Sequence, residues 1–554
     1  MLIDIEGIDG SGKTTISTRL EARLRQLGHP VVHAGELGAA GHTIERAIGR
    51  EGFRLSERSE LLLLAAREAQ RVETLIRPAL ERGAWVITDR YLYSLLATAR
   101  QAWGLDDASL PQALEFAVGG LLPEVVVLLD VEPAIARARR RCRGIASGEC
   151  APTGHFAQAG SGLLDRVDRE LKAFARADPA RWIVLDNTWT SLEEAEEKLL
   201  ELLLARIEHP AIASGPVAPA ARPRLPSTRP DDEAAVRKVL LEACDELSRH
   251  EPPVAAHLLY GLSGPDADER RLKLAFVAPG VIASGLTGLA GEGPLALRHA
   301  LKALEPRHVA LSLCGLADDE SDRLRVELIG QAPAEVAASL EGLASPRAFE
   351  LREELRGRAP SQVAASLAGD DTERAWELRG GLQTVASPES LAASLTGLGS
   401  ERAWSLREEL LEQVPLAVLA SLRGVGGEAA HRVREKHLRW APRAVLESLL
   451  GVDDEAAWRV REAHGERMRE ALESARGLDC ERAWGLRARL GSVWPGACAS
   501  SLEGLVGGAR GRELLFELLA RFPAHLELLR TAAFVLDPAR RQTTPGGPEI
   551  QQAG

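Results

Sequence analysis

Aromatic side chains are scarce in this 554-residue chain, which has 9 Phe, 10 Trp and 3 Tyr. An aromatic content of 4% is low for a β-sandwich and is typical of helices rich in Ala and Leu. Long apolar runs are missing too, because the strongest windows, at 61–66 and 125–129, are far shorter than the roughly 20 residues that a membrane-spanning helix needs. We therefore expect a largely helical protein with no membrane-spanning segment.

Cysteine pairs and an excess of basic charge are also missing. The six cysteines stand far apart, with no C-x-x-C pair and no His spacing typical of zinc, which excludes a disulfide scaffold and a zinc finger. They are Cys142, Cys150, Cys244, Cys314, Cys480 and Cys498. Acidic residues outnumber basic ones by 80 to 68, which disfavours a general binder of nucleic acid or of anionic membranes. Because the first residues also lack a secretory signal, we expect a protein of the reducing cytoplasm.

Proline clusters at one place in the chain, with six prolines between positions 210 and 230. This composition cannot propagate a helix or a central strand, so it predicts a semi-rigid linker over 209–232. At about 150 residues per domain, the whole chain is too long for one core. We expect one domain over 1–208, a second over 233–538, and a disordered polar tail over 539–554.

The first domain alternates short apolar runs with amphipathic stretches. Strands are expected at 2–6, 31–34, 85–88, 125–129 and 182–185, and helices over 13–27, 55–80 and 192–207. Apolar strands that alternate with helices indicate a parallel sheet covered on both faces. The fold class predicted for this domain is therefore α/β, with three layers around a parallel five-stranded sheet.

A repeat of about 27 residues follows the linker, and segments such as EVAASLEGLASPRAFELREEL and LAASLTGLGSERAWSLREEL make it visible. One glycine marks each unit, at Gly261, Gly288, Gly315, Gly342, Gly369, Gly397, Gly424, Gly451, Gly477 and Gly504. Glycine is the preferred helix stop, and such a unit holds two helices of about ten residues with their turns. An all-α solenoid of about ten helical repeats is expected.

The segment Gly7-Ile-Asp-Gly-Ser-Gly-Lys-Thr14 fits the phosphate-loop pattern G-x-x-x-x-G-K-[ST], and it lies between an expected strand and an expected helix. The glycines let backbone N–H groups surround phosphates, Lys13 supplies charge to the β- and γ-phosphates, and Thr14 supplies a hydroxyl for Mg²⁺. The residues expected to hold ATP are Gly7, Ile8, Asp9, Gly10, Ser11, Gly12, Lys13, Thr14 and Thr15.

An acid and a base, Asp89 and Arg90, follow the strand expected at 85–88. Open α/β sheets bind ligands at the carboxyl ends of their strands. Asp89 is therefore predicted to hold the metal through water, and Arg90 to grip a second phosphate. The alternative interpretation is an Asp–Arg pair that caps the next helix.

Three segments, IEGIDGSGKTT, SELLLLAAREAQRVETLIRPALERGAWVITDRY and LPEVVVLLDVEP, carry a family resemblance. Through these segments, residues 1–208 resemble the thymidylate kinase family of P-loop nucleoside monophosphate kinases. The 27-residue repeats, separately, resemble a HEAT-like array. The resemblance to the kinases covers under two fifths of the chain. It implies transfer of the γ-phosphoryl group of Mg-ATP to a nucleoside monophosphate, with the acceptor phosphate on Arg90 and Glu36 in the acceptor loop.

A basic run follows the strand expected at 125–129, with Arg137, Arg139, Arg140, Arg141 and Arg143. Phosphoryl transfer requires positive charge around the moving group, and this phosphate loop carries Gly10 where some family members have an arginine. The resemblance therefore assigns Arg139 and Arg143 to the transition state. A solvated basic helix face is the alternative.

Positions that the family uses for thymine differ here: Leu64 stands for a stacking Phe, Glu68 for a base-contacting Arg, and Gly35 for an acceptor-loop Arg. The lid is altered as well, at 154–157. Arg67 is the nearest substitute for the lost cation, although one step along a helix turns a side chain by about 100°. A thymidylate kinase with a rebuilt pocket, a kinase for another acceptor, and an ATP-binding domain that catalyses poorly all remain open.

Two polar columns run through the repeats. Arginine forms one, at 271, 298, 325, 352, 379, 407, 434, 461 and 487, and serine the other, at 312, 339, 366, 394, 421, 448, 474 and 501. Ladders in solenoids tie neighbouring repeats together through backbone carbonyls, while the alternative is a cationic strip for an acidic peptide or, less readily, nucleic acid. Extended repeat surfaces usually bind proteins, so a protein partner is expected.

The leading hypothesis is a cytoplasmic, Mg²⁺-dependent nucleoside monophosphate kinase, with dTMP as the expected acceptor and a solenoid for protein interaction. The rival hypothesis treats ATP as a ligand that switches a protein-interaction scaffold. Phosphoryl transfer distinguishes the two.

Overall fold

The computed structural model describes residues 1–35, 57–101, 105, 110–147, 162–208 and 232–537. The expected linker, except its last residue, and the expected tail lie outside these ranges. The chain divides into two compact units, one of Met1–Gly144 with Cys150–Arg224 and the other of Leu225–Gly554 with Ile145–Glu149.

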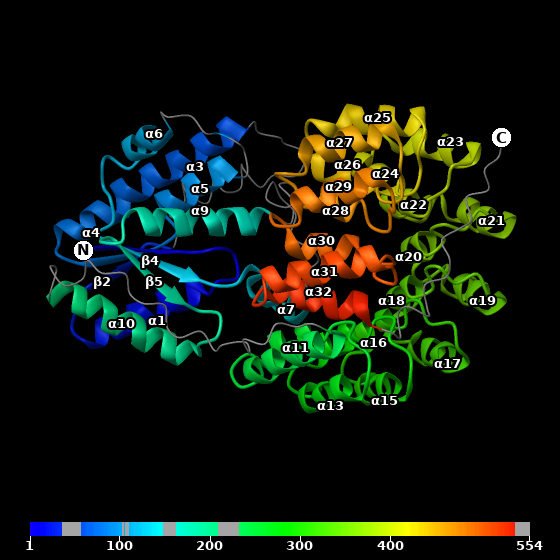
Figure 1. The fold of residues 1–554 in the computed structure, drawn as a ribbon, viewed down its shortest axis with the longest axis horizontal. Helices are drawn as coiled ribbons and strands as arrows, with labels where there is room; N and C mark the ends of the chain where they lie inside the picture. Colours follow the sequence, from blue (N-terminus) through cyan, green and yellow to red (C-terminus); the bar gives the residue numbers. More distant parts are fainter. Residues whose placement is uncertain (36–56, 102–104, 106–109, 148–161, 209–231, 538–554) are drawn as a thin grey trace. The chain divides into compact units, whose positions relative to one another are not determined.

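The first unit contains a five-stranded sheet in the order β2-β3-β1-β4-β5, and every paired neighbour runs parallel (Figure 1). The strands are β1 (Leu2–Glu6), β2 (Val31–His33), β3 (Trp85–Asp89), β4 (Val125–Asp130) and β5 (Trp182–Asp186). All five predicted strands are confirmed to within about one residue at their ends. The central position of β1 places the phosphate loop in the middle of the sheet's carboxyl edge.

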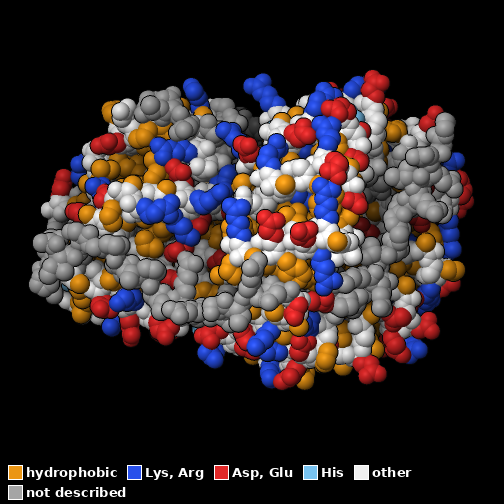
Figure 2. All heavy atoms as spheres, viewed as in Figure 1, with side chains coloured by type: hydrophobic (Ala, Val, Ile, Leu, Met, Phe, Trp, Pro, Cys, Tyr) orange, Lys and Arg blue, Asp and Glu red, His pale blue; other side chains and the backbone are white. Residues whose placement is uncertain are grey.

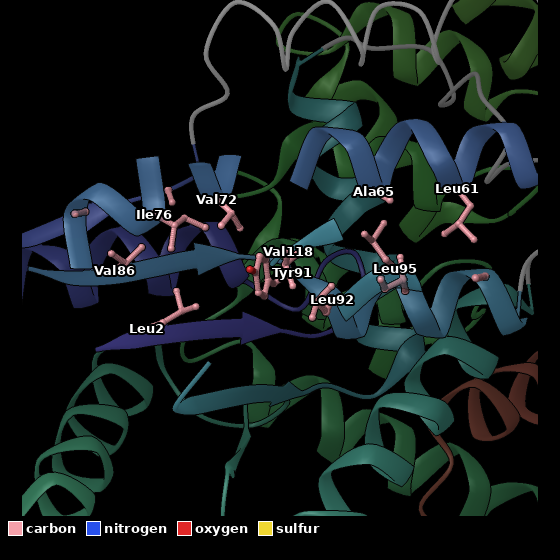
Figure 3. Close-up of a cluster of buried hydrophobic side chains, with 14 of the residues drawn as sticks. Leu2, Leu61, Ala65, Val72, Ile76, Val86, Tyr91, Leu92, Leu95 and Val118 are labelled. Carbon is pink, nitrogen blue, oxygen red and sulfur yellow. The ribbon is translucent and has the colours of Figure 1, made fainter. Parts of the chain in front are cut away.

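Helices cover both faces of this sheet. They are α1 (Lys13–Gln26), α3 (Glu57–Arg71), a π-helix (Val72–Ile76), α4 (Arg77–Glu81), α5 (Leu92–Gln101), α6 (Leu110–Ala117), α7 (Pro133–Ser147), α9 (Leu163–Ala177) and α10 (Leu192–Glu208). Side chains alternate along β1, so Leu2 joins the core with α3, α5 and α6, whereas Ile3 joins the core with α1 and α10. Figure 3 shows the first of these cores, where Leu2 and Val86 of the sheet face Val72 and Ile76.

The second unit consists of helix pairs. The longer helices are α11 (Glu233–Leu247), α13 (Pro265–Leu274), α15 (Glu292–Leu301), α17 (Asp319–Leu328), α19 (Pro346–Leu355), α21 (Glu373–Leu382), α23 (Glu401–Leu410), α25 (Glu428–Leu438), α27 (Glu455–His464), α29 (Glu481–Leu490) and α31 (Ala509–Arg521). The partners are α12 (Pro252–Leu258), α14 (Pro279–Gly285), α16 (Pro306–Ser312), α18 (Pro333–Ala338), α20 (Pro360–Ala365), α22 (Pro388–Ala393), α24 (Pro415–Ser421), α26 (Pro442–Ser448), α28 (Glu470–Glu473), α30 (Pro495–Ser501) and α32 (Leu526–Leu536). The predicted all-α repeat array is confirmed.

The repeating glycine ends the turn that follows each shorter helix. Its φ lies between 69° and 81° in all ten repeats, a left-handed conformation that residues with a Cβ adopt only at a cost. Proline begins most of the shorter helices, where its fixed φ suits the first helical position. The 27-residue period is thus a period of backbone geometry as well as of packing.

The array closes on itself, which the sequence analysis did not predict. Each shorter helix contacts the next from α12 to α30, α30 contacts α32, and α32 packs on α11, which in turn packs on α12. Figure 1 shows these helices as a ring, with the longer helices from α13 to α25 along its outside. At the junction, Ser263 Oγ donates a hydrogen bond to Asp537 Oδ2 over 2.7 Å, and the backbone N–H of Ser263 donates to the same oxygen over 3.0 Å.

The arginine column lies inside the ring wall and is structural. All nine arginines are at most 1% exposed. Arg461 is typical: Nε donates to Ser474 Oγ over 3.0 Å, and Nη2 donates to the carbonyl oxygens of Leu449 and Val452 over 2.7 and 2.8 Å. The interpretation of this column as a cationic strip is therefore wrong, because no partner can reach these guanidinium groups.

Aromatic residues stand three positions before several of these arginines and pack against them. The guanidinium carbon of Arg379 lies 4.6 Å from the ring centre of Trp376, and that of Arg461 lies 4.6 Å from the ring centre of Trp458.

Outside the wall, exposed charges pair across repeats, as Arg402 does with Glu373 over 2.9 Å. Figure 2 accordingly shows acidic and basic side chains interspersed over the repeats, not a surface of one sign. Among the described residues, no helix is both long and apolar enough to cross a membrane.

Candidate active site

The phosphate loop lies between β1 and α1, and its backbone requires glycine. Gly7, Gly10 and Gly12 have φ values of 149°, 93° and 93°. A Cβ on Gly10 would lie 2.2 Å from the carbonyl oxygen of Ala136 in α7, so the loop and this helix are in close contact. Ser11 Oγ is buried and has no hydrogen-bond partner within the described ranges. A cradle closed to side chains, with an unpaired hydroxyl inside, fits a phosphate group.

Lys13 begins α1 and is 7% exposed. Its Nζ donates a hydrogen bond to the carbonyl oxygen of Ile8 over 3.0 Å, which holds the amine over the loop. Burial, together with the positive charge of Arg90, lowers the pKa of Lys13 to about 7. A lysine with this pKa can take up a proton and form an ion pair when phosphates bind beside it.

We expect ATP binding to be accompanied by proton uptake. At pH 8 the Lys13 amine is mostly neutral in the free protein, and a bound triphosphate stabilises its charged form, so about one proton is taken up for each ATP bound. Uptake falls toward zero at pH 6, where the amine already carries its proton. Calorimetric titrations with Mg-ATP in two buffers of different ionisation enthalpy measure the number. An observed enthalpy that is independent of the buffer at pH 8 contradicts the prediction.

The metal-binding residues predicted from sequence come together. Parallel pairing of β1 with β3 sets Ile5 beside Asp89, and Thr14 Oγ1 donates a hydrogen bond to Asp89 Oδ2 over 2.6 Å. Mg²⁺ prefers oxygen ligands and usually takes one or two from the protein, with the rest from water and phosphates. No group of three or more His, Cys, Asp and Glu side chains in the described residues is arranged as a metal cage. The hydroxyl and carboxylate therefore fit a Mg²⁺ ion that arrives with ATP.

Arg90 turns toward the phosphate loop instead of capping the next helix. Its guanidinium forms an ion pair with Asp9 and donates from Nη1 to Ser94 Oγ over 2.9 Å. The charge of Arg90 lowers the pKa of Asp9 to about 2, so this carboxylate stays ionised. The capping interpretation of Asp89 and Arg90 is thus wrong, because Glu6 caps the start of α5 instead, with Oε1 accepting from the Ser94 backbone N–H over 3.0 Å.

Three functional candidates were missed in the sequence analysis: Glu6, Arg71 and Asn187. Asn187 follows β5, and its Nδ2 donates to the carbonyl oxygen of Ser11 over 2.7 Å. Glu6 is fully buried at the end of β1. Two acidic residues, Asp4 and Glu6, interrupt this buried central strand, and such an anomaly is visible in the sequence and could have marked Glu6. Nothing in the spacing of Asn187 or Arg71 marks them.

Of the two arginines assigned to the transition state, the structure brings one to the loop. Arg139 donates from Nη2 to the Asn187 carbonyl oxygen over 2.8 Å and from Nη1 to the Gly10 carbonyl oxygen over 3.5 Å. Arg143 is exposed farther along α7, and no contact joins it to the phosphate loop in the described part of the chain. Its role stays a prediction.

The acceptor side is partly described. Arg67 donates from both Nε and Nη2 to Glu68 Oε1, over 3.0 and 2.8 Å, so it folds toward the position of the lost cation. Glu68 is 1% exposed and also forms an ion pair with Arg71. Glu36 and the altered lid positions 154–157 lie outside the described residues. A substrate role for Arg67 or Glu36 remains a prediction.

Together, a parallel sheet in this order, a phosphate loop after its central strand, and an Asp–Arg pair on the neighbouring strand define a P-loop nucleotide-binding domain. A family model described as thymidylate kinase matches residues 5–199. The thymidylate kinase of Solidesulfovibrio magneticus is 36% identical over 189 residues, which are 34% of this chain and 90% of that protein. That of Deinococcus radiodurans is 37% identical over 190 residues, 34% of this chain and 89% of the relative. The chain belongs to the thymidylate kinase family.

Proposed function

We propose that the first unit transfers the γ-phosphoryl group of Mg-ATP to a nucleoside monophosphate, with dTMP as the preferred acceptor, giving dTDP and ADP. Membership of the thymidylate kinase family supports this activity. The observation that carries it is the convergence of Lys13, the Thr14–Asp89 pair and Arg90 at one edge of the sheet. This set has charge for the donor phosphates, oxygen ligands for a cation, and charge for an acceptor phosphate.

The chemistry required of these residues is electrostatic, because phosphoryl transfer needs little covalent help from protein. Thr14 and Asp89 would hold a Mg²⁺ ion bound with ATP, and that ion would supply positive charge against the phosphates. Lys13, in the phosphate loop, supplies positive charge to the oxygens of the β- and γ-phosphates. Arg90 holds the acceptor phosphate opposite, with its guanidinium oriented by Asp9 and Ser94. Arg139 adds positive charge beside Gly10.

An assay of ADP release with purified full-length protein, Mg-ATP and a panel of monophosphates tests the proposal. The panel contains dTMP, dUMP, dCMP, dGMP and AMP, because Leu64 and Glu68 alter the base side of the site. We expect turnover that depends on the acceptor and is fastest with dTMP. A protein that binds ATP but releases no ADP with any acceptor refutes the kinase and favours the nucleotide-switched scaffold.

We also propose that the repeat ring binds a protein partner and that the chain acts in the cytoplasm. Repeat arrays present extended surfaces that commonly bind proteins, and the acidic and basic side chains interspersed on this one suit a polar interface. We expect the partner to bind the folded ring, whose structure depends on the buried arginines. Capture that is equal with and without ATP separates this role from the nucleotide-switched scaffold.

A further inference from the structure

Arg90 holds an uncommon backbone conformation. Its φ is 69°, and within the described ranges it is the one residue other than glycine with a positive φ. A side chain disfavours this left-handed region, so neighbouring groups must hold it. Its backbone N–H donates to the carbonyl oxygen of Ile5 over 3.1 Å. The direction in which the Arg90 side chain leaves the strand depends on this turn being kept.

Arg71 holds the other side of the same turn. Its Nη2 donates to the carbonyl oxygen of Arg90 over 2.7 Å, and its Nη1 donates to the carbonyl oxygen of Ala34 over 3.0 Å. Arg71 is 7% exposed. One rigid guanidinium thereby spans the residue that follows β2 and the residue that follows β3, which are neighbouring strands.

The surroundings of Arg71 fix its guanidinium in place. Glu68, one turn earlier on α3, forms an ion pair with it, and the guanidinium carbon lies 5.7 Å from the ring centre of Tyr91. Arg71 is also the last residue of α3, and the chain continues as the π-helix from Val72. Single π-turns within α-helices are frequent at functional sites, since the extra residue redirects the side chains around it.

We propose that Arg71 is a positioning residue for the acceptor phosphate: it keeps Arg90 in its left-handed turn and sets the span between Arg90 and the end of β2. This inference rests on the proposed kinase function. Arg71 acts through Arg90 and does not itself need to touch the substrate. It belongs to the acceptor half of the site, since in the donor half Lys13 donates to the Ile8 carbonyl oxygen and Thr14 donates to Asp89.

The variant Arg71→Met tests the proposal in the full-length protein. We expect the KM for the monophosphate to rise about 10- to 100-fold, because a displacement near 1 Å costs up to about that much in catalytic efficiency. The KM for ATP should change less than about twofold. Arg71→Lys should recover part of the loss, since an ammonium can keep the ion pair with Glu68 and one of the two carbonyl bonds. Arg77→Met is the matched control, because Arg77 begins α4, directly after the π-helix, and pairs with the exposed Glu73.

A double-mutant cycle separates positioning from a general loss of structure. If Arg71 works through Arg90, adding Arg71→Met to Arg90→Ala leaves kcat/KM for the monophosphate unchanged, because the group being positioned is already gone. Effects that multiply independently, or equal rises in both KM values, overturn the inference. A wild-type protein without turnover refutes the proposed function itself, whereas an active wild type with an unaltered Arg71→Met variant refutes the positioning role alone.

Discussion

Replacement of Lys13 by alanine lowers kcat/KM for phosphoryl transfer by about 10³-fold or more while the protein stays folded. The reason is that Lys13 is the buried amine of the phosphate loop, held over it by a hydrogen bond to the Ile8 carbonyl oxygen, and it carries a positive charge once phosphates are bound. Charge placed at a buried site acts in a low dielectric and needs no reorganisation during the reaction. Initial rates of ADP release at varied ATP and acceptor concentrations measure the effect.

Two further variants define what the loss means. Lys13→Arg restores little activity, because a planar guanidinium cannot replace a compact ammonium in a site that leaves 7% of the residue exposed. Lys198→Ala is the matched control, since Lys198 lies on α10 with a side chain 44% exposed and pairs with Glu201. It should keep wild-type rates. A Lys13→Ala protein that retains a tenth of the activity would mean that other groups supply the charge, and the assignment of the loop would then fail.

Local patterns predicted the parts of the first unit whose geometry is local. Strand positions follow from apolar runs, and the phosphate loop follows from glycines whose conformations the structure then requires, as at Gly10. Because parallel strands end at one edge, the meeting of Thr14 with Asp89 could be expected before their distance was known. These predictions succeeded because each depends on a few neighbouring residues and on one rule of sheet topology.

Tertiary partnerships were beyond the reach of such patterns. Arg71 resembles any basic residue on a helix, and only the placement of Ala34 and Arg90 reveals its two carbonyl contacts. Ring closure is similar, since Ser263 and Asp537 lie 274 positions apart and neither belongs to the repeating columns. A period shows that repeats stack, but the small rotation from one repeat to the next decides whether the stack closes, and no single residue encodes it.

The arginine column confirms the structural ladder that was predicted ahead of a cationic strip. A row of basic residues on a repeat suggests a binding surface, yet these side chains are buried with carbonyl and serine partners. Arginine suits this task because its charge is permanent and its several N–H groups lie in a fixed plane. One guanidinium can therefore bind the preceding turn, its own repeat and the serine of the next shorter helix. The column links successive repeats all along the wall of the ring.

Arg461→Ala should consequently lower the free energy of unfolding of the ring by about 3–5 kcal/mol. Removal of this guanidinium takes a donor from Ser474 Oγ and from three carbonyl oxygens. Ser474 Oγ keeps its bond to the Ala471 carbonyl oxygen and the Leu449 carbonyl oxygen keeps the N–H of Val452, whereas the carbonyl oxygens of Val452 and Ser474 lose the donor described for them. Each unsatisfied buried group costs about 1–3 kcal/mol, and partial relaxation brings the sum down. Arg461→Lys should recover less than half of the loss, since one ammonium cannot reach acceptors on three sides. Urea unfolding followed by far-ultraviolet circular dichroism measures the change.

Arg459→Ala provides the matched control, because Arg459 is two residues away on the same helix and is exposed. Its effect should stay within about 0.5 kcal/mol. An open solenoid can fray from its ends, so a weakened internal repeat need not affect distant ones. In a closed ring there is no end, and every repeat depends on the junction of α11 with α32. Arg461→Ala should therefore shift the unfolding of the whole ring together, and a separate early transition limited to a few repeats would argue that the ring opens before it unfolds.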